Sequence, residues 1–180
     1  MNPASNLILV GPMGAGKSCI GRRLAERYGL RLLDADREIE QRTGATVSTI
    51  FECEGEPGFR ARERSTLAEL LADDEVLLAT GGGAVLDADN RQLLRARGFV
   101  VHLQVSVDQQ LERLARDRTR PLLQRDDREQ VLHDLARARA PLYAEVADLQ
   151  FDTDHLTAEV AAARLADALD ARWQRHGGAA

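Results

Sequence analysis

Lysine is almost missing from this sequence: of 24 basic residues, one is lysine and 23 are arginine. Cysteine is scarce too, and the spacing of Cys19 and Cys53 fits neither a disulfide framework nor a metal-binding pair. With 4% aromatic residues and a net charge of −5, the composition argues against a generic affinity for nucleic acid. No apolar run is long enough to span a membrane, and residues 1–6 lack the pattern of a signal peptide. We therefore expect a cytoplasmic protein that binds neither nucleic acid nor membranes.

The chain does have enough apolar sequence for one well-packed core. Its 180 residues are 44% hydrophobic, which suits a single domain over residues 1–180. Apolar runs alternate with helical patterns, as they do in βαβ units with a parallel sheet. We expect strands at residues 7–10, 30–33, 76–79, 99–105 and 148–151. We expect helices at residues 17–28, 37–43, 57–71, 90–97, 107–116, 127–143 and 157–175. The pattern predicts an α/β fold, a three-layer sandwich with a five-stranded parallel sheet.

The lone lysine lies in the stretch Gly11-Pro-Met-Gly-Ala-Gly-Lys-Ser18, between an apolar run and an amphipathic segment. Two glycines with four residues between them, followed by lysine and serine, predict a phosphate-binding P-loop. In such a loop the backbone N–H groups face the phosphates, and Gly14 and Gly16 suit that close approach. Lys17 would neutralise β- and γ-phosphate oxygens of a nucleotide, while the Ser18 hydroxyl would coordinate Mg²⁺.

Two regions interrupt the simple alternation of strands and helices. Residues from about 35 to 71 contain more helical pattern than one crossover needs, which predicts a helical insertion that holds substrate. Residues from about 112 to 128 are rich in charge and poor in apolar side chains. They contain Arg113, Arg116, Arg118, Arg120, Arg125 and Arg128, interleaved with aspartates. This composition alone fits two structures equally, a mobile arginine-bearing lid and a solvated charged face.

Two carboxylates, Asp34 and Asp36, follow the expected strand 30–33. At the end of a strand, one of them can face a metal ion and the other a substrate hydroxyl. Asp36 can also be the N-cap of a helix that starts at Arg37, so a purely structural role stays open at this point.

Three glycines, Gly81 to Gly83, follow the expected strand 76–79 and Thr80. In an open α/β sheet, ligands bind at the carboxyl ends of the strands. Because glycines lose much backbone entropy on folding, such a run predicts backbone amides that approach a ligand closely, although a flexible connector is the alternative.

Together these motifs resemble the shikimate kinase family, in order and at matching separations from about residue 6 to residue 155. The motifs are Gly11-Pro-Met-Gly-Ala-Gly-Lys-Ser18, Asp34-Ala-Asp36, Gly55-Glu-Pro-Gly-Phe-Arg60, Thr80-Gly-Gly-Gly83, Arg120-Pro-Leu-Leu123 and Arg139-Ala-Pro-Leu-Tyr143. The resemblance implies a P-loop NTPase fold like that of nucleoside monophosphate kinases, with a shikimate-binding insertion and a lid. It implies transfer of phosphate from ATP to the 3-hydroxyl of shikimate, giving shikimate 3-phosphate and ADP on the route to chorismate and the aromatic amino acids.

The resemblance also implies residue roles, and it favours the lid interpretation of residues 112–128. The catalytic residues would be Lys17, Asp36 and Arg120. The nucleotide would be bound by Gly14, Ala15, Gly16, Lys17, Ser18, Cys19, Arg113 and Arg120, with Arg113 stacked on adenine. Mg²⁺ would be held by Ser18 and Asp34, and shikimate by Asp36, Arg60, Gly81, Gly82, Gly83 and Arg139.

One departure and two rival functions remain. Cys19 stands where the family commonly has threonine, and because a thiol donates more weakly than a hydroxyl, we expect a modest effect on nucleotide affinity. Another small-molecule kinase of the same fold, such as a gluconate kinase, would also bind a polyhydroxy carboxylate. A non-catalytic nucleotide-binding module that regulates a partner is the rival from another class. We expect a monomer.

Overall fold

A computed structural model of the chain describes residues 4–115 and 126–175, and its centre is a five-stranded sheet. The strands are β1 (Leu7–Val10), β2 (Arg31–Asp34), β3 (Val76–Ala79), β4 (Phe99–Gln104) and β5 (Leu149–Asp152). Their order is β2-β3-β1-β4-β5, and every neighbouring pair is parallel. Each strand lies within one residue of its expected position at either end.

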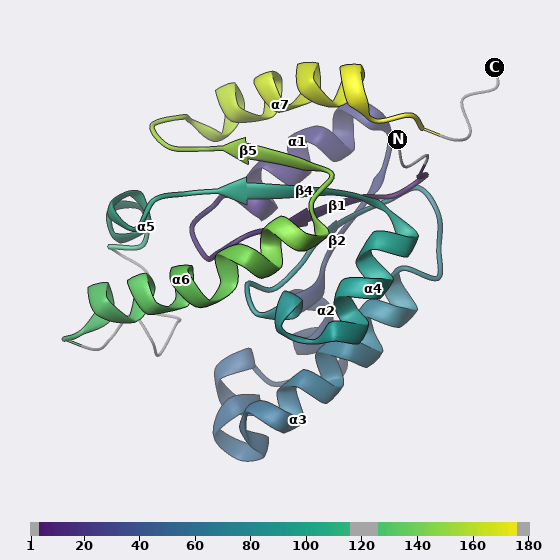
Figure 1. The fold of residues 1–180 in the computed structure, drawn as a ribbon. Helices are drawn as coiled ribbons and strands as arrows, with labels where there is room; N and C mark the ends of the chain where they lie inside the picture. Colours follow the sequence, from purple (N-terminus) through teal and green to yellow (C-terminus); the bar gives the residue numbers. More distant parts are fainter. Residues whose placement is uncertain (1–3, 116–125, 176–180) are drawn as a thin grey trace.

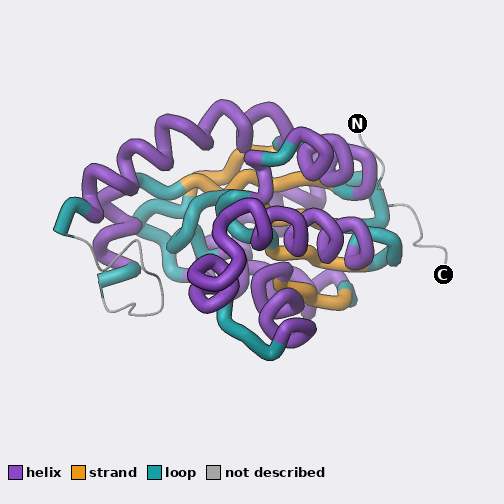
Figure 2. Tube along the Cα trace, turned by 90° about the horizontal axis from the view of Figure 1, so that it is seen from below, coloured by secondary structure: helices purple, strands orange, loops and turns teal. Residues whose placement is uncertain are grey.

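Helices cover both faces of this sheet (Figures 1 and 2). They are α1 (Lys17–Tyr28), α2 (Ala35–Thr43), α3 (Val47–Leu70), α4 (Ala88–Arg97), α5 (Val107–Arg113), α6 (Arg128–Val146) and α7 (Ala158–Arg172), with a 3₁₀ turn η1 (Ala84–Leu86). Helices α1 and α7 lie on one face, and α3, α4 and α6 lie on the other (Figure 1). The predicted three-layer sandwich is therefore confirmed.

The central strand β1 explains why its four residues are all apolar. Leu7 and Leu9 point into the core shared with α1 and α7, whereas Ile8 and Val10 point into the core shared with α3, α4 and α6. All four side chains are fully buried. A parallel strand that is covered on both faces needs a continuous apolar run instead of an alternating one.

The insertion differs from its prediction in where its helices begin. Helix α3 begins at Val47, ten residues before the expected start, and is interrupted at Gly55, where φ is 71° and ψ is −179°. The Thr46 hydroxyl caps its first turn by accepting from the Thr49 N–H group at 3.1 Å. The β-branched residues that follow Thr46 hide this helical turn from a periodicity argument. The insertion has a small core of its own, centred on Ile39, Ile50 and Phe59.

Both ends of the described chain meet at one side of the molecule. The Trp173 indole N–H group donates to the Ala4 carbonyl oxygen at 2.8 Å. The Trp173 ring also meets the Tyr28 ring edge to face, with centroids 5.3 Å apart. These contacts tie the C-terminal end of α7 to α1 and to the segment that leads into β1. Both ends of the described chain lie near the amino ends of the strands, where β1 begins (Figure 1).

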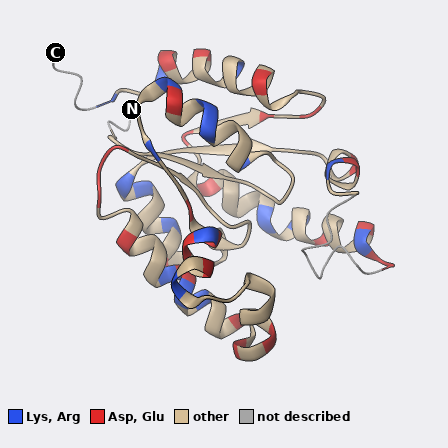
Figure 3. Ribbon diagram, turned by 180° about the vertical axis from the view of Figure 1, so that it is seen from behind, with Lys and Arg blue, Asp and Glu red and all other residues tan. Residues whose placement is uncertain are grey.

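The outer surface carries charges of both signs along its helices (Figure 3). Among the described residues, the large hydrophobic side chains left exposed are Leu86 and Val160, which lie on different elements. None of the helices that the structure describes is long and apolar enough to cross a membrane. Within residues 4–115 and 126–175, the large hydrophobic side chains that are exposed are therefore isolated from each other along the chain.

Candidate active site

The predicted site residues gather at the carboxyl edge of the sheet. The P-loop follows β1, Asp34 ends β2, and the glycine triplet Gly81 to Gly83 follows β3. Because β2, β3 and β1 are adjacent and parallel, these three segments meet at one edge, beside α6. This is the edge at which open α/β sheets bind ligands.

Two glycines give the P-loop its shape. Gly11 has φ of +148°, and a Cβ atom there would overlap the Leu103 carbonyl oxygen of β4. Gly16 has φ of +92° and is the N-cap residue of α1. Side chains rarely adopt this backbone conformation, so both positions require glycine.

The first turn of α1 is left without a side-chain cap. In contrast, α2, α3, α4, α5 and α7 each begin with a side chain that accepts from a backbone N–H group in the first turn, and α6 is the other described α-helix without such a cap. The amides at the start of α1 are thereby kept for a ligand, and a helix N-terminus with such amides suits a phosphate. This arrangement supports the nucleotide-binding roles predicted for Gly14 to Cys19.

The lone lysine reaches across this loop. The Lys17 ammonium group donates to the carbonyl oxygens of Gly11 at 2.7 Å and Pro12 at 2.9 Å. These contacts hold the positive charge over the loop, next to the uncapped amides. A compact ammonium group with three donors can keep such contacts while it faces phosphate oxygens.

A candidate metal position lies beside the P-loop. The Ser18 hydroxyl donates to Asp34 Oδ2 at 2.7 Å, while Asp34 Oδ1 accepts from the Arg37 N–H group and caps α2. The N-cap of this helix is therefore Asp34, and the alternative that assigned the cap to Asp36 is wrong, because α2 begins at Ala35. Asp36 lies in the first turn instead.

The donors at this position fit Mg²⁺. A hydroxyl and a carboxylate are hard oxygen ligands, and Mg²⁺ usually binds one or two such groups together with substrate phosphates. No group of three or more His, Cys, Asp or Glu side chains among the described residues forms a metal cage. A shared site, completed by nucleotide phosphates, is what Ser18 and Asp34 can form.

The predicted substrate residues surround the glycine triplet. A Cβ atom at Gly81 would lie 2.8 Å from Asp36 Oδ1, and one at Gly82 would lie 3.4 Å from Arg139 Nη1. At Gly83 it would overlap the guanidinium group of Arg60. The triplet is therefore not a loose connector: it packs directly against two guanidinium groups and a carboxylate that come from three distant parts of the chain.

Glu63 belongs to this cluster, although none of the sequence motifs includes it. Its side chain is buried, Oε2 accepts from Arg60 Nη1 at 2.7 Å, and Oε1 is buried without a hydrogen-bond partner. Burial raises the pKa of Glu63, while the positive charge of Arg60 opposes that shift. The position three residues after Arg60 on a helix was the available signal, since residues at this spacing share a helix face.

Arg60 is also held by aromatic rings. Its guanidinium carbon lies 5.3 Å from the Phe59 ring centroid and 6.0 Å from that of Phe51. With Glu63 on another side, the guanidinium group is fixed before any ligand binds. Such preorganisation lowers the entropy lost when an anion is bound.

The remaining predicted residues lie around the nucleotide end. Arg113, at the end of α5, donates to the Gly14 carbonyl oxygen at 2.9 Å and to Thr153 Oγ1 at 3.0 Å. It therefore bridges the P-loop and the loop after β5, and its stacking on adenine stays a prediction. The Cys19 thiol is exposed. Arg120 and most of the expected lid lie outside the described residues.

A P-loop on a five-stranded parallel sheet, with an uncapped helix, a lysine and an oxygen pair for a metal, defines a P-loop phosphotransferase. Comparison with known proteins makes this specific. The sequence model of the shikimate kinase family matches residues 13–170. The chain belongs to the shikimate kinase family.

Individual relatives agree with this assignment. The chain is 63% identical to a shikimate kinase of Stenotrophomonas maltophilia (strain R551-3) and 60% identical to one of Xanthomonas campestris pv. campestris (strain 8004). Each alignment covers 97% of both chains. The structure is similar to that of a shikimate kinase from Acinetobacter baumannii in complex with shikimate, with a TM-score of 0.90, 48% identity, and coverage of 94% and 95%. The predicted family, enzyme class and fold are confirmed.

Proposed function

We propose that this protein transfers the γ-phosphoryl group of ATP to the 3-hydroxyl of shikimate with the residues that surround the glycine triplet and the P-loop. Shikimate is a carboxylate that bears three hydroxyls. Arg60 and Arg139 can hold the carboxylate through paired hydrogen bonds, and the Asp36 carboxylate can accept from a hydroxyl. Gly81 to Gly83 would add backbone N–H groups at the same end of the substrate.

The nucleotide would lie on the P-loop side of the same cluster. The backbone amides of Gly14 to Cys19 and the Lys17 ammonium group would hold the β- and γ-phosphates. Ser18 and Asp34 would hold Mg²⁺, which when bound neutralises phosphate charge. Because phosphoryl transfer needs mainly positioning and charge stabilisation, Asp36 would act by orienting the attacking hydroxyl and accepting its proton late. Arg120 would approach the transferred group from the lid.

One observation carries this proposal. Asp36 and Arg139 are more than 100 residues apart in the sequence, yet both contact the glycine triplet beside the uncapped first turn of α1. A nucleotide-binding module without catalysis would not need an acceptor site at this place. A gluconate kinase would need one, so the choice between the two acceptors is tested directly.

The test is a coupled assay of ADP formation with ATP, Mg²⁺ and either shikimate or gluconate. We expect turnover with shikimate and none above background with gluconate. Asp36→Asn should lower kcat by about 100-fold or more, because an amide cannot accept the hydroxyl proton. Asp89→Asn is the matched control, since Asp89 is an exposed aspartate in the first turn of α4, away from the site.

Two results would contradict the proposal. A folded protein that forms no ADP with shikimate would leave nucleotide binding alone as its function. Equal activity of Asp36→Asn and Asp89→Asn would remove Asp36 from the mechanism.

We further propose that the enzyme works as a monomer in the cytoplasm and binds neither nucleic acid nor membranes. The scarcity of exposed large hydrophobic side chains among the described residues and the acidic net charge of −5 support this. Light scattering after size exclusion should give a mass near 19.8 kDa. A mass of twice this value would contradict the monomer.

A further inference from the structure

A buried tyrosine on α6 contacts the glycine triplet. The Tyr143 hydroxyl donates to the Gly82 carbonyl oxygen at 2.5 Å, across 61 residues of sequence. The carbonyl oxygens of Gly81 and Gly83 accept from N–H groups within the following turn, at 3.2 Å from Ala84 and 3.0 Å from Leu86. Gly82 is thus the glycine of the triplet whose carbonyl group is held from outside the loop.

Because the peptide bond is planar, this hydrogen bond also fixes the direction of the next N–H group. The Gly82 carbonyl group and the Gly83 N–H group belong to one rigid plane and point to opposite sides. A hydrogen bond that fixes the carbonyl toward Tyr143 therefore fixes the N–H group away from it. Gly82 packs against Arg139 and Gly83 against Arg60, so this peptide lies between the two guanidinium groups assigned to the substrate carboxylate.

The tyrosine is itself held in place. Its side chain is 2% exposed, and its ring stacks on the ring of His102 from β4, with centroids 4.8 Å apart and planes inclined by 28°. Burial raises the pKa of Tyr143 to about 12, against the effect of the nearby Arg139 charge, so the hydroxyl keeps its proton and remains a donor. Burial and the charge of Lys17 lower the pKa of His102 to about 4, so the stacked ring is neutral at pH 7.

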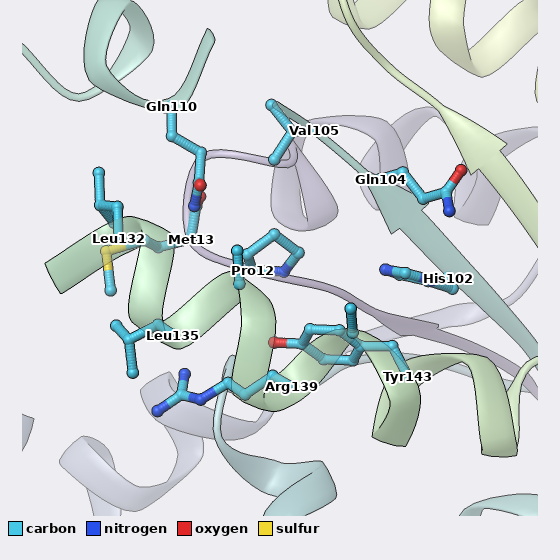
Figure 4. Close-up of a pocket in the computed structure, with 12 residues that line it drawn as sticks. Pro12, Met13, His102, Gln104, Val105, Gln110, Leu132, Leu135, Arg139 and Tyr143 are labelled. Carbon is cyan, nitrogen blue, oxygen red and sulfur yellow. The ribbon is translucent and has the colours of Figure 1, made fainter. Parts of the chain in front are cut away.

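The space beside this pair explains why the stacking matters. His102, Tyr143 and Arg139 line a cavity of about 170 Å³ between β4, α6 and the P-loop (Figure 4). The cavity walls are mainly apolar, with Leu132, Leu135 and Ala136 on the α6 side. Without His102, the tyrosine ring could tilt into this space and withdraw its hydroxyl from Gly82.

We propose that Tyr143 is a positioning residue for substrate binding: its hydroxyl, supported by the stacked ring of His102, orients the Gly82–Gly83 peptide so that the Gly83 N–H group faces the substrate carboxylate. Tyr143 acts through the loop and does not touch the reacting atoms. The inference rests on the proposed carboxylate-binding roles of Arg60 and Arg139. A change at Tyr143 should therefore affect binding of the shikimate carboxylate and leave ATP binding unchanged.

The test compares Tyr143→Phe with Tyr28→Phe, since Tyr28 is the other tyrosine and also donates hydrogen bonds, to Asp170 and Ala166 at the far side of the sheet. Tyr143→Phe should raise the KM for shikimate about tenfold, the effect expected from one hydrogen bond, and leave the KM for ATP within about twofold. Tyr28→Phe should leave both KM values unchanged. Thermal unfolding of both variants checks that each is folded.

A modified substrate makes the test specific to the carboxylate. With an analogue in which a hydroxymethyl group replaces the carboxylate, wild type and Tyr143→Phe should have the same KM. Three results would each overturn the inference. Tyr143→Phe raises the KM for shikimate and the KM for the analogue by the same factor, it raises the KM for shikimate and the KM for ATP by the same factor, or it leaves the KM for shikimate unchanged. Wild-type turnover with shikimate is measured first, so a failure of the proposed function shows itself separately.

The stacking partner is tested by rescue. His102→Ala should raise the KM for shikimate about threefold, because the tyrosine ring is released on one side, and His102→Phe should restore the wild-type value by restoring the stack. Equal values for the two variants would overturn the part assigned to His102.

Discussion

At the scale of single residues, Lys17 shows how one side chain is set apart by its surroundings. Its ammonium group donates to two carbonyl oxygens of a loop whose shape depends on glycines. A planar guanidinium group is larger and spreads its charge and its donors over a fork, so it would place the positive charge differently over the same loop. Every other basic residue of the chain is arginine. Position 17 is therefore where we expect the difference between an ammonium and a guanidinium group to affect function.

We predict that Lys17→Arg folds but loses transfer. Because the P-loop lies at the surface and the net charge is unchanged, the melting temperature should stay within about 2 °C, while kcat falls by about 100-fold or more. The measurement is ADP release at saturating substrates, with Arg23→Lys on the exposed face of α1 as the control for an arginine–lysine exchange. Activity near wild type would mean that the single lysine has no special role.

The residues around the site differ in how far sequence could reveal them. Gly11, Lys17 and Ser18 lie in one short motif, so their spacing was enough. Glu63 had a local signal, its position three residues after Arg60 on a helix. Tyr143 was missed because the fold brings its partner to it: it contacts a carbonyl 61 residues away.

At the scale of secondary-structure elements, the start of α2 combines a structural and a chemical task in one side chain. Asp34 caps the helix with one oxygen and accepts from Ser18 with the other. The sequence showed two aspartates after a strand but could not say which one begins the helix, since either spacing allows a cap. The hydrogen bond from the Arg37 N–H group to Asp34 decides this, and Asp36 in the first turn of α2 is left to face the glycine triplet.

We predict that Asp34→Asn separates these two tasks. Asparagine caps helices as well as aspartate does, so stability should change by less than about 0.5 kcal/mol. The amide carries no charge for a metal, so the Mg²⁺ concentration for half-maximal activity should rise about tenfold. A titration of activity with Mg²⁺ measures this, with Asp87→Asn at the N-cap of α4 as control. An unchanged midpoint would remove Asp34 from the metal site.

The glycine triplet gives a second prediction at this scale. Gly83→Ala should place a methyl group against the end of the Arg60 side chain, which can move, so the fold should persist while the guanidinium group is displaced. We expect the KM for shikimate to rise by about tenfold or more. Gly29→Ala is the control: its φ of +63° costs about 1–2 kcal/mol for a side chain, but no atom lies within 4 Å of the new methyl group. It should lower the melting temperature and leave the KM unchanged.

At the scale of the whole molecule, the order of apolar runs and helices was enough to predict the sheet and its layers. Every described strand was found. The inner strands β1, β3 and β4 are buried along almost their whole length, as in Leu7–Val10, whereas the edge strands β2 and β5 are only partly buried and have shorter apolar runs. The first half of α3 was not found, because its start depends on the Thr46 cap and its β-branched residues do not show a helical period. The sheet could thus be predicted from short stretches of sequence. Much of the substrate site could not, because it depends on contacts between residues that are far apart in the sequence.

Stability of the whole fold should depend on the buried histidine. Because the pKa of His102 is about 4 in the folded protein and about 6.5 when unfolded, the unfolded chain binds an extra proton between these values, so stability is lost as the pH falls from 6.5 to 4. We predict that wild type loses about 2 kcal/mol more than His102→Phe between pH 7.5 and pH 5. Urea unfolding at both pH values measures this difference. The same loss in both proteins would exclude His102 as its source.

The hydrogen bond from Trp173 to Ala4 has a practical consequence for the molecule as a whole. It holds both ends of the described chain near the amino ends of the strands, where β1 begins. The P-loop and the glycine triplet lie at the opposite, carboxyl ends of the strands. A chain attached to a surface through either end would therefore turn its catalytic edge toward the solution. Immobilised enzyme should accept shikimate and ATP as freely from one orientation of attachment as from the other.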